Sequence, residues 1–247
     1  MKKAQTIFSQ DNHRWIAIAR DPARASYMID TNEYLIVDGE DALLTDPGGS
    51  EIFSVVFPAL CEVFDPRLIK NLFASHQDPD IISSLGLWLD FNPEIKCHMS
   101  RLWTTFVPHF GGDDKTFCAI SDEGGDIRIG NLLVKAIPAH YLHSSGNFHL
   151  YDPLAKILFS GDIGAALGFE ENGDDIFVRD FDQHIRFAEG FHRRWMGSNV
   201  AKLDWCERAS KMDIDMMCPQ HGAIFTGPDV GRFINWFAEL KVGSGIP

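Results

Sequence analysis

The chain has 247 residues, 45% of them hydrophobic, and no Pro- or Gly-rich linker divides it, so we expect a single domain over residues 1–247. Its 22 Lys plus Arg against 35 Asp plus Glu give a formal net charge of -13, which argues against nucleic-acid binding as the main function. No stretch has the length and apolar character of a signal peptide or a membrane span, which predicts a cytoplasmic protein without membrane association.

The first third of the chain predicts a hairpin, a helix, a strand and a second helix. Tyr34–Val37 and Ala42–Thr45 flank a turn that contains a glycine, a pattern typical of a β-hairpin. Apolar residues recur at helical spacing over residues 50–63, and the apolar run 68–74 is typical of a buried strand. Residues 81–90 predict another helix.

The middle of the chain alternates short apolar runs with turns. A helix is expected near residues 100–105. Residues 126–129 and 132–137 flank a Gly-Asn turn and predict a second hairpin. Residues 148–151 and 157–160 flank an Asp-Pro turn and predict a third.

The last third is richer in helix. Residues 164–179 form an acidic, Gly-rich stretch that is long enough to predict a lid. Apolar periodicity predicts helices over 182–196, 200–212 and 230–240, with a short strand at 215–218 between them. The aromatic stripe of the first of these helices is typical of core packing.

Candidate metal ligands follow the apolar run 68–74. His76 comes at its end, with Asp78 and Asp80 two and four residues on, so several ligating side chains leave one strand end together. One histidine and two aspartates are too few to enclose a dinuclear site. Further His and Asp candidates appear downstream, at or near the ends of apolar runs: His143, Asp162 and His221.

The chemistry of this donor set limits the choice of metal. The five cysteines are scattered without metal-chelating spacing, which indicates free thiols rather than ligands. Histidine and carboxylate without thiolate suit iron or manganese, with zinc also possible.

The order and spacing of these stretches resemble the metallo-β-lactamase superfamily. Its first motif is His-x-His-x-Asp-His, and later motifs supply a His before Gly-Ser or Gly-Asn, an Asp that closes a strand, and a His before Gly. Here the first motif carries carboxylates two and four residues after His76, and the last is Pro219-Gln220-His221-Gly222. This variant is most similar to the diiron branch, the flavodiiron proteins and their stand-alone oxygen-binding relatives.

The resemblance implies a fold and a ligand assignment. The fold would be the α/β (α+β) four-layer αβ/βα sandwich of the superfamily. Two non-haem iron ions would be held by six side chains: His76, Asp78 and His143 on metal 1, Asp80 and His221 on metal 2, and Asp162 as the bridge.

Three positions leave alternatives open. Flavodiiron proteins carry Glu where this chain has Asp78, so the shorter side chain would reach the metal directly only if the loop shifts, or else through water. The superfamily's usual histidine is Ile81 here, and His140 either fills that vacancy, supports a ligand, or is a histidine bonded to backbone. Asp46 either holds the metal loop or is a turn-forming Asp before Pro47.

The resemblance also frames the function. The sequence shows neither a flavodoxin nor a rubredoxin domain and no Gly-rich phosphate loop, so reduction of O2 or NO would need a separate electron donor. The acid-rich donor set favours redox chemistry over hydrolysis, because carboxylates stabilise the oxidised metal. We therefore expect a diiron protein that binds or reduces O2, or NO, as a sensor with a signalling partner, and a homodimer is a further expectation. The alternative is a metal-dependent hydrolase of a thioester, lactam or phosphodiester.

Overall fold

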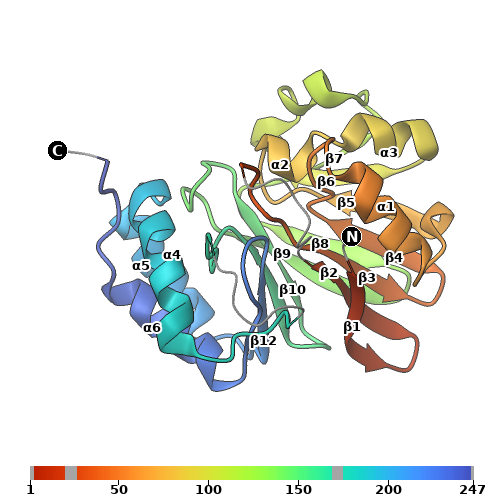
Figure 1. Ribbon diagram of the computed structural model, residues 1–247. Coiled ribbons are helices and arrows are strands. Elements are labelled where there is room, and N and C mark those ends of the chain that lie inside the picture. The colour runs from red at the N-terminus through yellow and green to blue at the C-terminus, as the bar shows by residue number, and fades with distance from the viewer. Residues whose placement is uncertain (1–2, 20–26, 169–174, 246–247) are drawn as a thin grey trace.

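The computed structural model describes residues 3–19, 27–168 and 175–245, and these form two β-sheets with helices on both outer faces (Figure 1). Sheet 1 has seven strands in the order of the chain: β1 (Lys3–Gln10), β2 (His13–Ala19), β3 (Glu33–Asp38), β4 (Asp41–Thr45), β5 (Ile69–Phe73), β6 (Lys96–Ser100) and β7 (Phe117–Ile120). Sheet 2 has six, in the order β13 (Phe225–Thr226), β12 (Met216–Pro219), β11 (Ile157–Gly161), β10 (Phe148–Asp152), β9 (Leu132–Pro138) and β8 (Gly125–Ile129).

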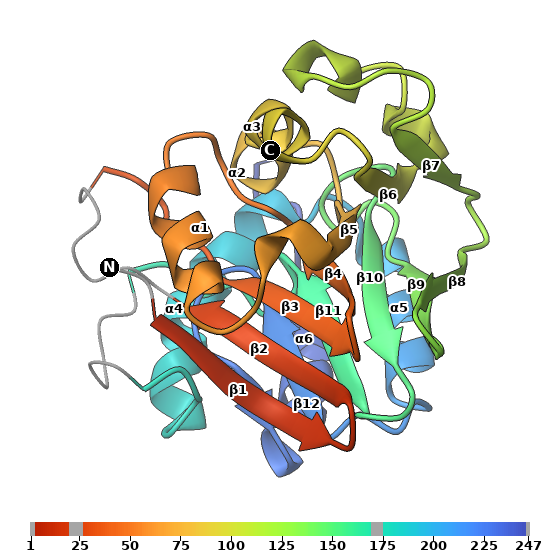
Figure 2. The same ribbon diagram turned by 90° about the vertical axis from the view of Figure 1, so that its right-hand side faces the viewer.

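Helices cover both sheets and complete four layers, the predicted αβ/βα arrangement. Sheet 1 is covered by α1 (Phe53–Cys61), α2 (Pro79–Ile82) and α3 (Leu85–Phe91), and sheet 2 by α4 (Phe181–Trp195), α5 (Asn199–Ala209) and α6 (Pro228–Glu239). Figure 2 looks from the side of α1, with sheet 1 in front of sheet 2. Short 3₁₀ turns lie at Pro66–Leu68, Arg101–Trp103 and Val107–Phe110.

The sheets are joined by an aromatic core. Phe159 of sheet 2 packs between Tyr34 and Phe73 of sheet 1, with ring centroids 5.7 and 6.2 Å apart. All three rings are fully buried. Because buried aromatic rings stabilise mainly by the apolar area they remove from water, this contact fixes the spacing of the two sheets.

Parallel pairing directs the strand ends. Strand β5 runs parallel to β4 and β6, and β11 runs parallel to β12. The carboxyl ends of neighbouring parallel strands meet at one edge of a sheet, where loops can carry a site. The predicted hairpins β3–β4, β8–β9 and β10–β11 are confirmed, and they set these directions.

Two predicted helices have a different form. The helix expected over 81–90 is interrupted between α2 and α3, because Ser84 donates its backbone N–H to the carbonyl of Gly48 and its hydroxyl to that of Pro47. The helix expected near 100–105 is a single 3₁₀ turn, Arg101–Trp103. Strand β1 was not predicted, since at the edge of sheet 1 its exposed and half-buried side chains lack a regular alternation.

The predicted lid lies partly outside the described residues, which omit 169–174. The chain on either side is fixed to the protein. Ala165 and Ala166 are buried, and Phe177 forms a bridge to Ile224.

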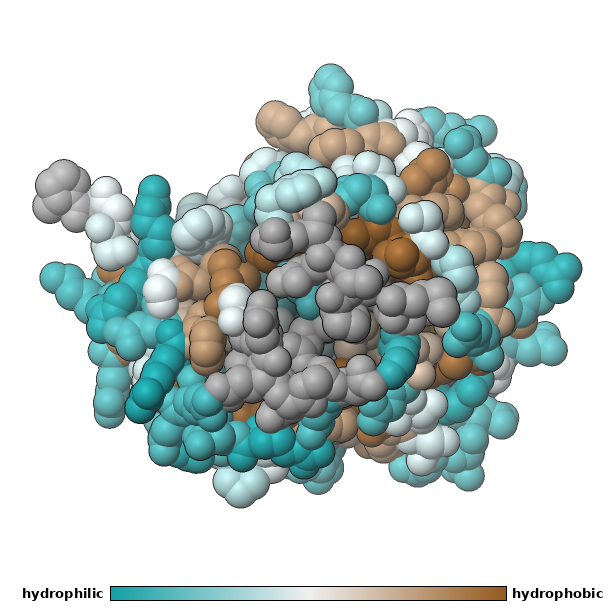
Figure 3. Space-filling model, in the orientation of Figure 1, coloured by the Kyte–Doolittle hydropathy of each residue, from teal (hydrophilic) through white to brown (hydrophobic). Residues whose placement is uncertain are grey.

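The surface is uneven in character. Apolar surface gathers on the upper right of Figure 3, over the layer of α1 to α3, and hydrophilic side chains dominate the left, over α4 to α6. None of the helices in the described part of the chain combines the length and apolar character that crossing a bilayer requires.

Candidate metal centre

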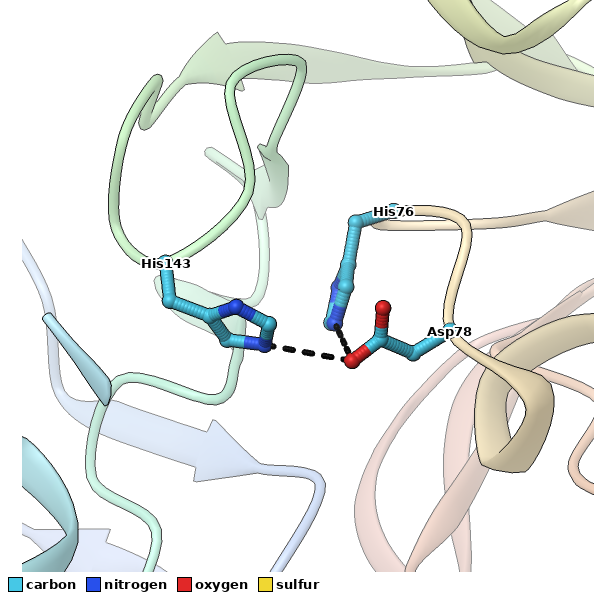
Figure 4. Close-up of side chains that lie close together, drawn as sticks. All are labelled: His76, Asp78 and His143. Atoms are coloured by element: carbon cyan, nitrogen blue, oxygen red, sulfur yellow. Dashed lines mark ion pairs between the residues drawn. The ribbon is translucent and has the colours of Figure 1, made fainter. Parts of the chain in front are cut away.

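Three predicted ligands converge where β5 ends. His76 and Asp78 lie in the loop between β5 and α2, and His143 reaches them from the loop between β9 and β10 (Figure 4). Oδ2 of Asp78 lies 3.6 Å from Nε2 of His76 and 3.4 Å from Nε2 of His143. One ligand atom from each residue falls within 4.8 Å of the others, so a single cation could contact all three.

Asp162 faces two groups of side chains at once. It follows β11, and its Oδ2 lies 2.8 Å from Nε2 of His143 and 3.5 Å from Nε2 of His76. Its other oxygen, Oδ1, lies 3.3 Å from Nε2 of His221, which follows β12. Nε2 of His221 is also 3.4 Å from Oδ2 of Asp80. The structure therefore brings together the six residues that the sequence predicted, with one carboxylate between two halves.

Neighbouring groups orient the imidazoles. Nδ1 of His221 lies 2.6 Å from the carbonyl of Asp30, and because a carbonyl only accepts, this nitrogen carries the proton. Nδ1 of His76 lies 2.9 Å from the hydroxyl of Ser75. In both residues Nδ1 is held by this neighbour, so Nε2, which faces the carboxylates, is the nitrogen left to bind a metal.

Asp46 supports the loop that carries His76. Its carboxylate accepts hydrogen bonds of 2.7 Å from both the backbone N–H and the hydroxyl of Ser75. Burial raises the pKa of Asp46 to about 7, although His76 and the Ser75 hydrogen bonds oppose this rise. Of the two alternatives for Asp46, the structure supports the one in which it holds the metal loop.

Opposite charges couple the two halves. Burial would lower the pKa of His143, but the carboxylates of Asp162 and Asp78 raise it to about 10. Burial would also lower the pKa of His221, but the carboxylates of Asp162 and Asp80 outweigh this effect and raise the pKa to about 10. Burial would raise the pKa of Asp162, yet the surrounding imidazoles hold it well below the usual range. Cations that bind here would displace protons from the histidines.

Two unsatisfied atoms test whether a metal fits. Among the described residues, Nε2 of His76 and Oδ1 of Asp162 are buried without a hydrogen bond of good geometry. A buried polar atom left in this way is costly. Nε2 of His76 faces one half of the site and Oδ1 of Asp162 faces the other, so one cation in each half would satisfy both atoms. The nitrogen and oxygen donors, without thiolate, suit iron, manganese or zinc. The residues thus fit a pair of metal ions.

The structure also shows where the residues of the remaining sequence alternatives lie, and direct binding of a metal by Asp78 stays a prediction. Asp78, despite its short side chain, reaches both histidines through Oδ2. Ile81 is fully buried in the core beneath sheet 1, so its side chain is not part of the site. His140 lies apart from the six residues, with Nε2 2.8 Å from the carbonyl of Asp122 and its ring edge-on to Phe148.

A cavity of about 320 Å³ opens over the site, a volume in the lower range for small-ligand pockets. Besides five of the six residues, it is lined by Ile29, Glu51, Phe191 and Trp195. Phe191 and Trp195 stack at 5.2 Å, and Trp195 is 50% exposed. The sequence predicted the aromatic stripe of α4 as core, and periodicity cannot reveal that its end borders the pocket.

Comparison with known proteins identifies the family. Residues 29–222 match the sequence model described as "ODP family beta lactamase". The apo state of the chemotaxis sensor ODP from T. denticola superposes with a TM-score of 0.87 and 37% identity, covering 99% of this chain and 97% of that one. The peroxy diiron species of that sensor gives a TM-score of 0.86 at the same identity and coverage.

More distant relatives match by structure or by sequence. A flavo di-iron protein variant from Thermotoga maritima has a TM-score of 0.80 and 23% identity, over 96% of this chain and 61% of that one. An uncharacterized protein of Methanocaldococcus jannaschii is 25% identical over 202 residues, which are 78% of this chain and 49% of that protein. The chain thus spans about half the length of this curated relative.

These matches confirm the predicted resemblance to the diiron branch of the metallo-β-lactamase superfamily and its four-layer fold. The matched segment begins before β3 and ends just after His221, so it contains all the strand ends that form the site. The chain belongs to the ODP family of β-lactamase-fold proteins.

Proposed function

We propose that this protein binds O2 at a non-haem diiron centre. The observation that carries the proposal is the position of Asp162, whose two oxygens face two separate groups of side chains, in a chain 37% identical to the diiron chemotaxis sensor ODP. The iron ligands would be the six converging residues: His76, Asp78 and His143 on one side, Asp80 and His221 on the other, and Asp162 between them.

The chain's own residues would prepare the site for this cofactor. When bound, a pair of ferrous ions supplies electrons to a diatomic ligand. The carboxylates of Asp78, Asp80 and Asp162 offset the charge of two divalent cations. Phe191 and Ile29 give the cavity an apolar wall, which limits water around the ligand.

The wider setting is part of the proposal. A single domain of this kind would work with a separate electron donor or signalling protein in the cytoplasm. NO is the second diatomic ligand that the same chemistry would accept. A homodimer remains a prediction, which the molecular mass in solution would test.

The experiment that tests this function starts with protein purified without oxygen. We expect two irons per chain and a new absorption band on exposure to air. His76→Ala should lose both features, whereas His109→Ala, an exposed histidine outside the site, should keep them. Zinc in place of iron, with ester turnover in the absence of a reductant, would overturn the proposal in favour of a hydrolase. A wild-type spectrum unchanged by air would also contradict it.

A further inference from the structure

Gln77 connects two of the loops that carry metal-facing side chains, the loop after β5 and the loop between β9 and β10, and the roles assigned above do not use it. Its Nε2 lies 3.0 Å from Oδ1 of Asp78, in the loop after β5. Its Oε1 accepts a hydrogen bond of 2.7 Å from the hydroxyl of Ser144, the neighbour of His143. The side chain of Gln77 thus contacts both its sequence neighbour and a residue 67 positions away.

The chemistry of the end groups fixes the direction of this chain of hydrogen bonds. An ionised carboxylate only accepts, so Gln77 must turn its amide NH₂ toward Asp78 and its oxygen toward Ser144. The hydroxyl of Ser144 must then donate to Gln77, and it can accept the N–H of Gly146, 3.4 Å away. Each bond polarises the next in the same sense, which strengthens the series.

This series leaves Asp78 with one oxygen for the site. Oδ1 is engaged by Gln77, and Oδ2 is the oxygen that lies near His76 and His143. The side chain of Asp78 is 32% exposed, whereas that of Asp162 is 4% exposed. Burial therefore restrains Asp162 but restrains Asp78 far less, and Asp78 depends on a specific partner for its orientation.

We infer that Gln77 is a positioning residue, anchored by Ser144, that turns Oδ2 of Asp78 toward the imidazoles and makes this short carboxylate a one-oxygen ligand. The inference rests on the proposed metal centre and deepens it. Partners of metal ligands in other proteins change metal affinity by about 10-fold to 100-fold when they are removed. Gln77 should act on the ion beside His76 and His143 and leave the ion beside His221 unaffected.

The test uses Co²⁺ as the probe, because its absorption reports ligand geometry without any turnover. Gln77→Met keeps the length of the side chain and removes both hydrogen bonds. Gln77→Glu keeps the acceptor for Ser144 and removes the donor to Asp78. Competition with a chelator should show one of the two Co²⁺ ions bound about tenfold more weakly in both variants, with an altered visible spectrum. Gln183→Met, on the exposed face of α4, should match the wild type.

Ser144→Ala provides an independent variant. It should weaken binding of the same Co²⁺ ion by a smaller factor. The double variant with Gln77→Met should bind that ion no more weakly than Gln77→Met alone, because both substitutions act through one series of hydrogen bonds. If Gln77→Met fails to fold, Gln77→Glu and Ser144→Ala decide the question. Wild-type affinity and spectrum in the folded Gln77 variants would overturn this inference and leave the diiron proposal intact. A wild type that binds neither Co²⁺ nor Fe²⁺ would overturn both.

Discussion

Two clusters of histidine and aspartate lie at opposite ends of β10, and only one of them has the features of a metal site. In the far cluster, at the end of β10 away from the metal-facing residues, Nε2 of His13 lies 2.6 Å from Oδ2 of Asp152, and Nδ1 of His13 lies 2.9 Å from the carbonyl oxygen of Val37. Trp15 also donates to Oδ2 of Asp152, at 2.7 Å. Two backbone N–H groups of the following turn donate to Oδ1. Every polar atom of this pair has a partner.

The metal-facing cluster differs in what it leaves unsatisfied. Nε2 of His76 and Oδ1 of Asp162 are buried without a hydrogen bond to any of the residues that the structure describes, although carboxylates and imidazoles surround them. Both clusters combine histidine with aspartate, and His76 and Asp162 are as deeply buried as His13 and Asp152, so neither property of these residues distinguishes a structural pair from a ligand set. The difference lies in hydrogen-bonding capacity that the protein itself leaves free. His13–Asp152 should therefore control stability, and the Asp162 cluster should control metal content.

The largest effect should come from Asp162→Asn. The amide removes the charge that faces both halves and replaces one oxygen with a donor, so iron affinity should fall by more than about 100-fold, beyond what outer partners of ligands cost. Iron content of the purified variant should drop from two per chain to less than one. Asp152→Asn is the matched control and should keep both irons. Retention of two irons by Asp162→Asn would contradict the difference between the clusters.

The second effect concerns the far cluster alone. His13→Gln cannot supply the positive charge beside Asp152, and breaking a buried ion pair costs about 3 kcal/mol of unfolding free energy. Urea unfolding of metal-free protein would measure this loss. Iron content should remain at two per chain. As the control, His109→Gln replaces an exposed histidine and should change the unfolding free energy by less than about 0.5 kcal/mol. The larger loss in His13→Gln would then be due to the buried pair.

The third substitution should affect both stability and metal binding. Asn32 donates through Nδ2 to the carbonyls of Pro219 and Gly222, at 3.1 and 2.8 Å, and so holds the turn that presents His221. Asn32→Ala should lower the unfolding free energy by about 2 kcal/mol, because two buried acceptors lose a donor. It should also weaken binding of the iron beside His221, whereas the iron beside His76 and His143 should stay bound.

Tyr34→Phe offers a milder change at the same turn. The Tyr34 hydroxyl donates to Pro219 at 2.9 Å, so this variant removes one hydrogen bond and costs about 1 kcal/mol. Chelator competition would compare the two variants. Equal loss of both irons in Asn32→Ala would show that the halves of the site are not held independently.

The sequence could predict the ligands because each follows or lies near a strand end, and an apolar run reveals where a strand stops. His76, Asp162 and His221 were found in this way. Parallel pairing of β11 with β12 explains why Asp162 and His221 meet, and the packing of the two sheets brings the end of β5 with His76 to them. What surrounds them was harder to predict. The hydrogen bond between Gln77 and Ser144 depends on a loop 67 residues away, and no local pattern encodes that approach.

The errors have a common cause in tertiary contacts. The break at Ser84 arises from hydrogen bonds to the loop after β4, whereas apolar periodicity continues through it. Trp195 continues the aromatic stripe of α4, but the stripe passes beyond the core to the rim of the cavity. Periodicity reports which side chains share a face, and the position of that face depends on the neighbouring elements.

The smallest effect is the pH dependence of the far cluster. Burial lowers the pKa of His13, but the hydrogen bonds to Asp152 and Val37 outweigh this and raise it above its ordinary 6.5. The pKa of Asp152 lies below its ordinary 3.8, since His13 and Trp15 outweigh burial. The contribution of His13 to stability is therefore complete below pH 6.5 and is lost as the pH rises through its folded pKa, whereas that of Asp152 is lost in acid. In metal-free protein, the stability difference between the wild type and His13→Gln should be largest near about pH 5 and should shrink toward about pH 9. Because the histidines of the metal site are present in both proteins, their titration cancels in this difference, and a difference that grew with pH would show that His13 is buried as a neutral imidazole.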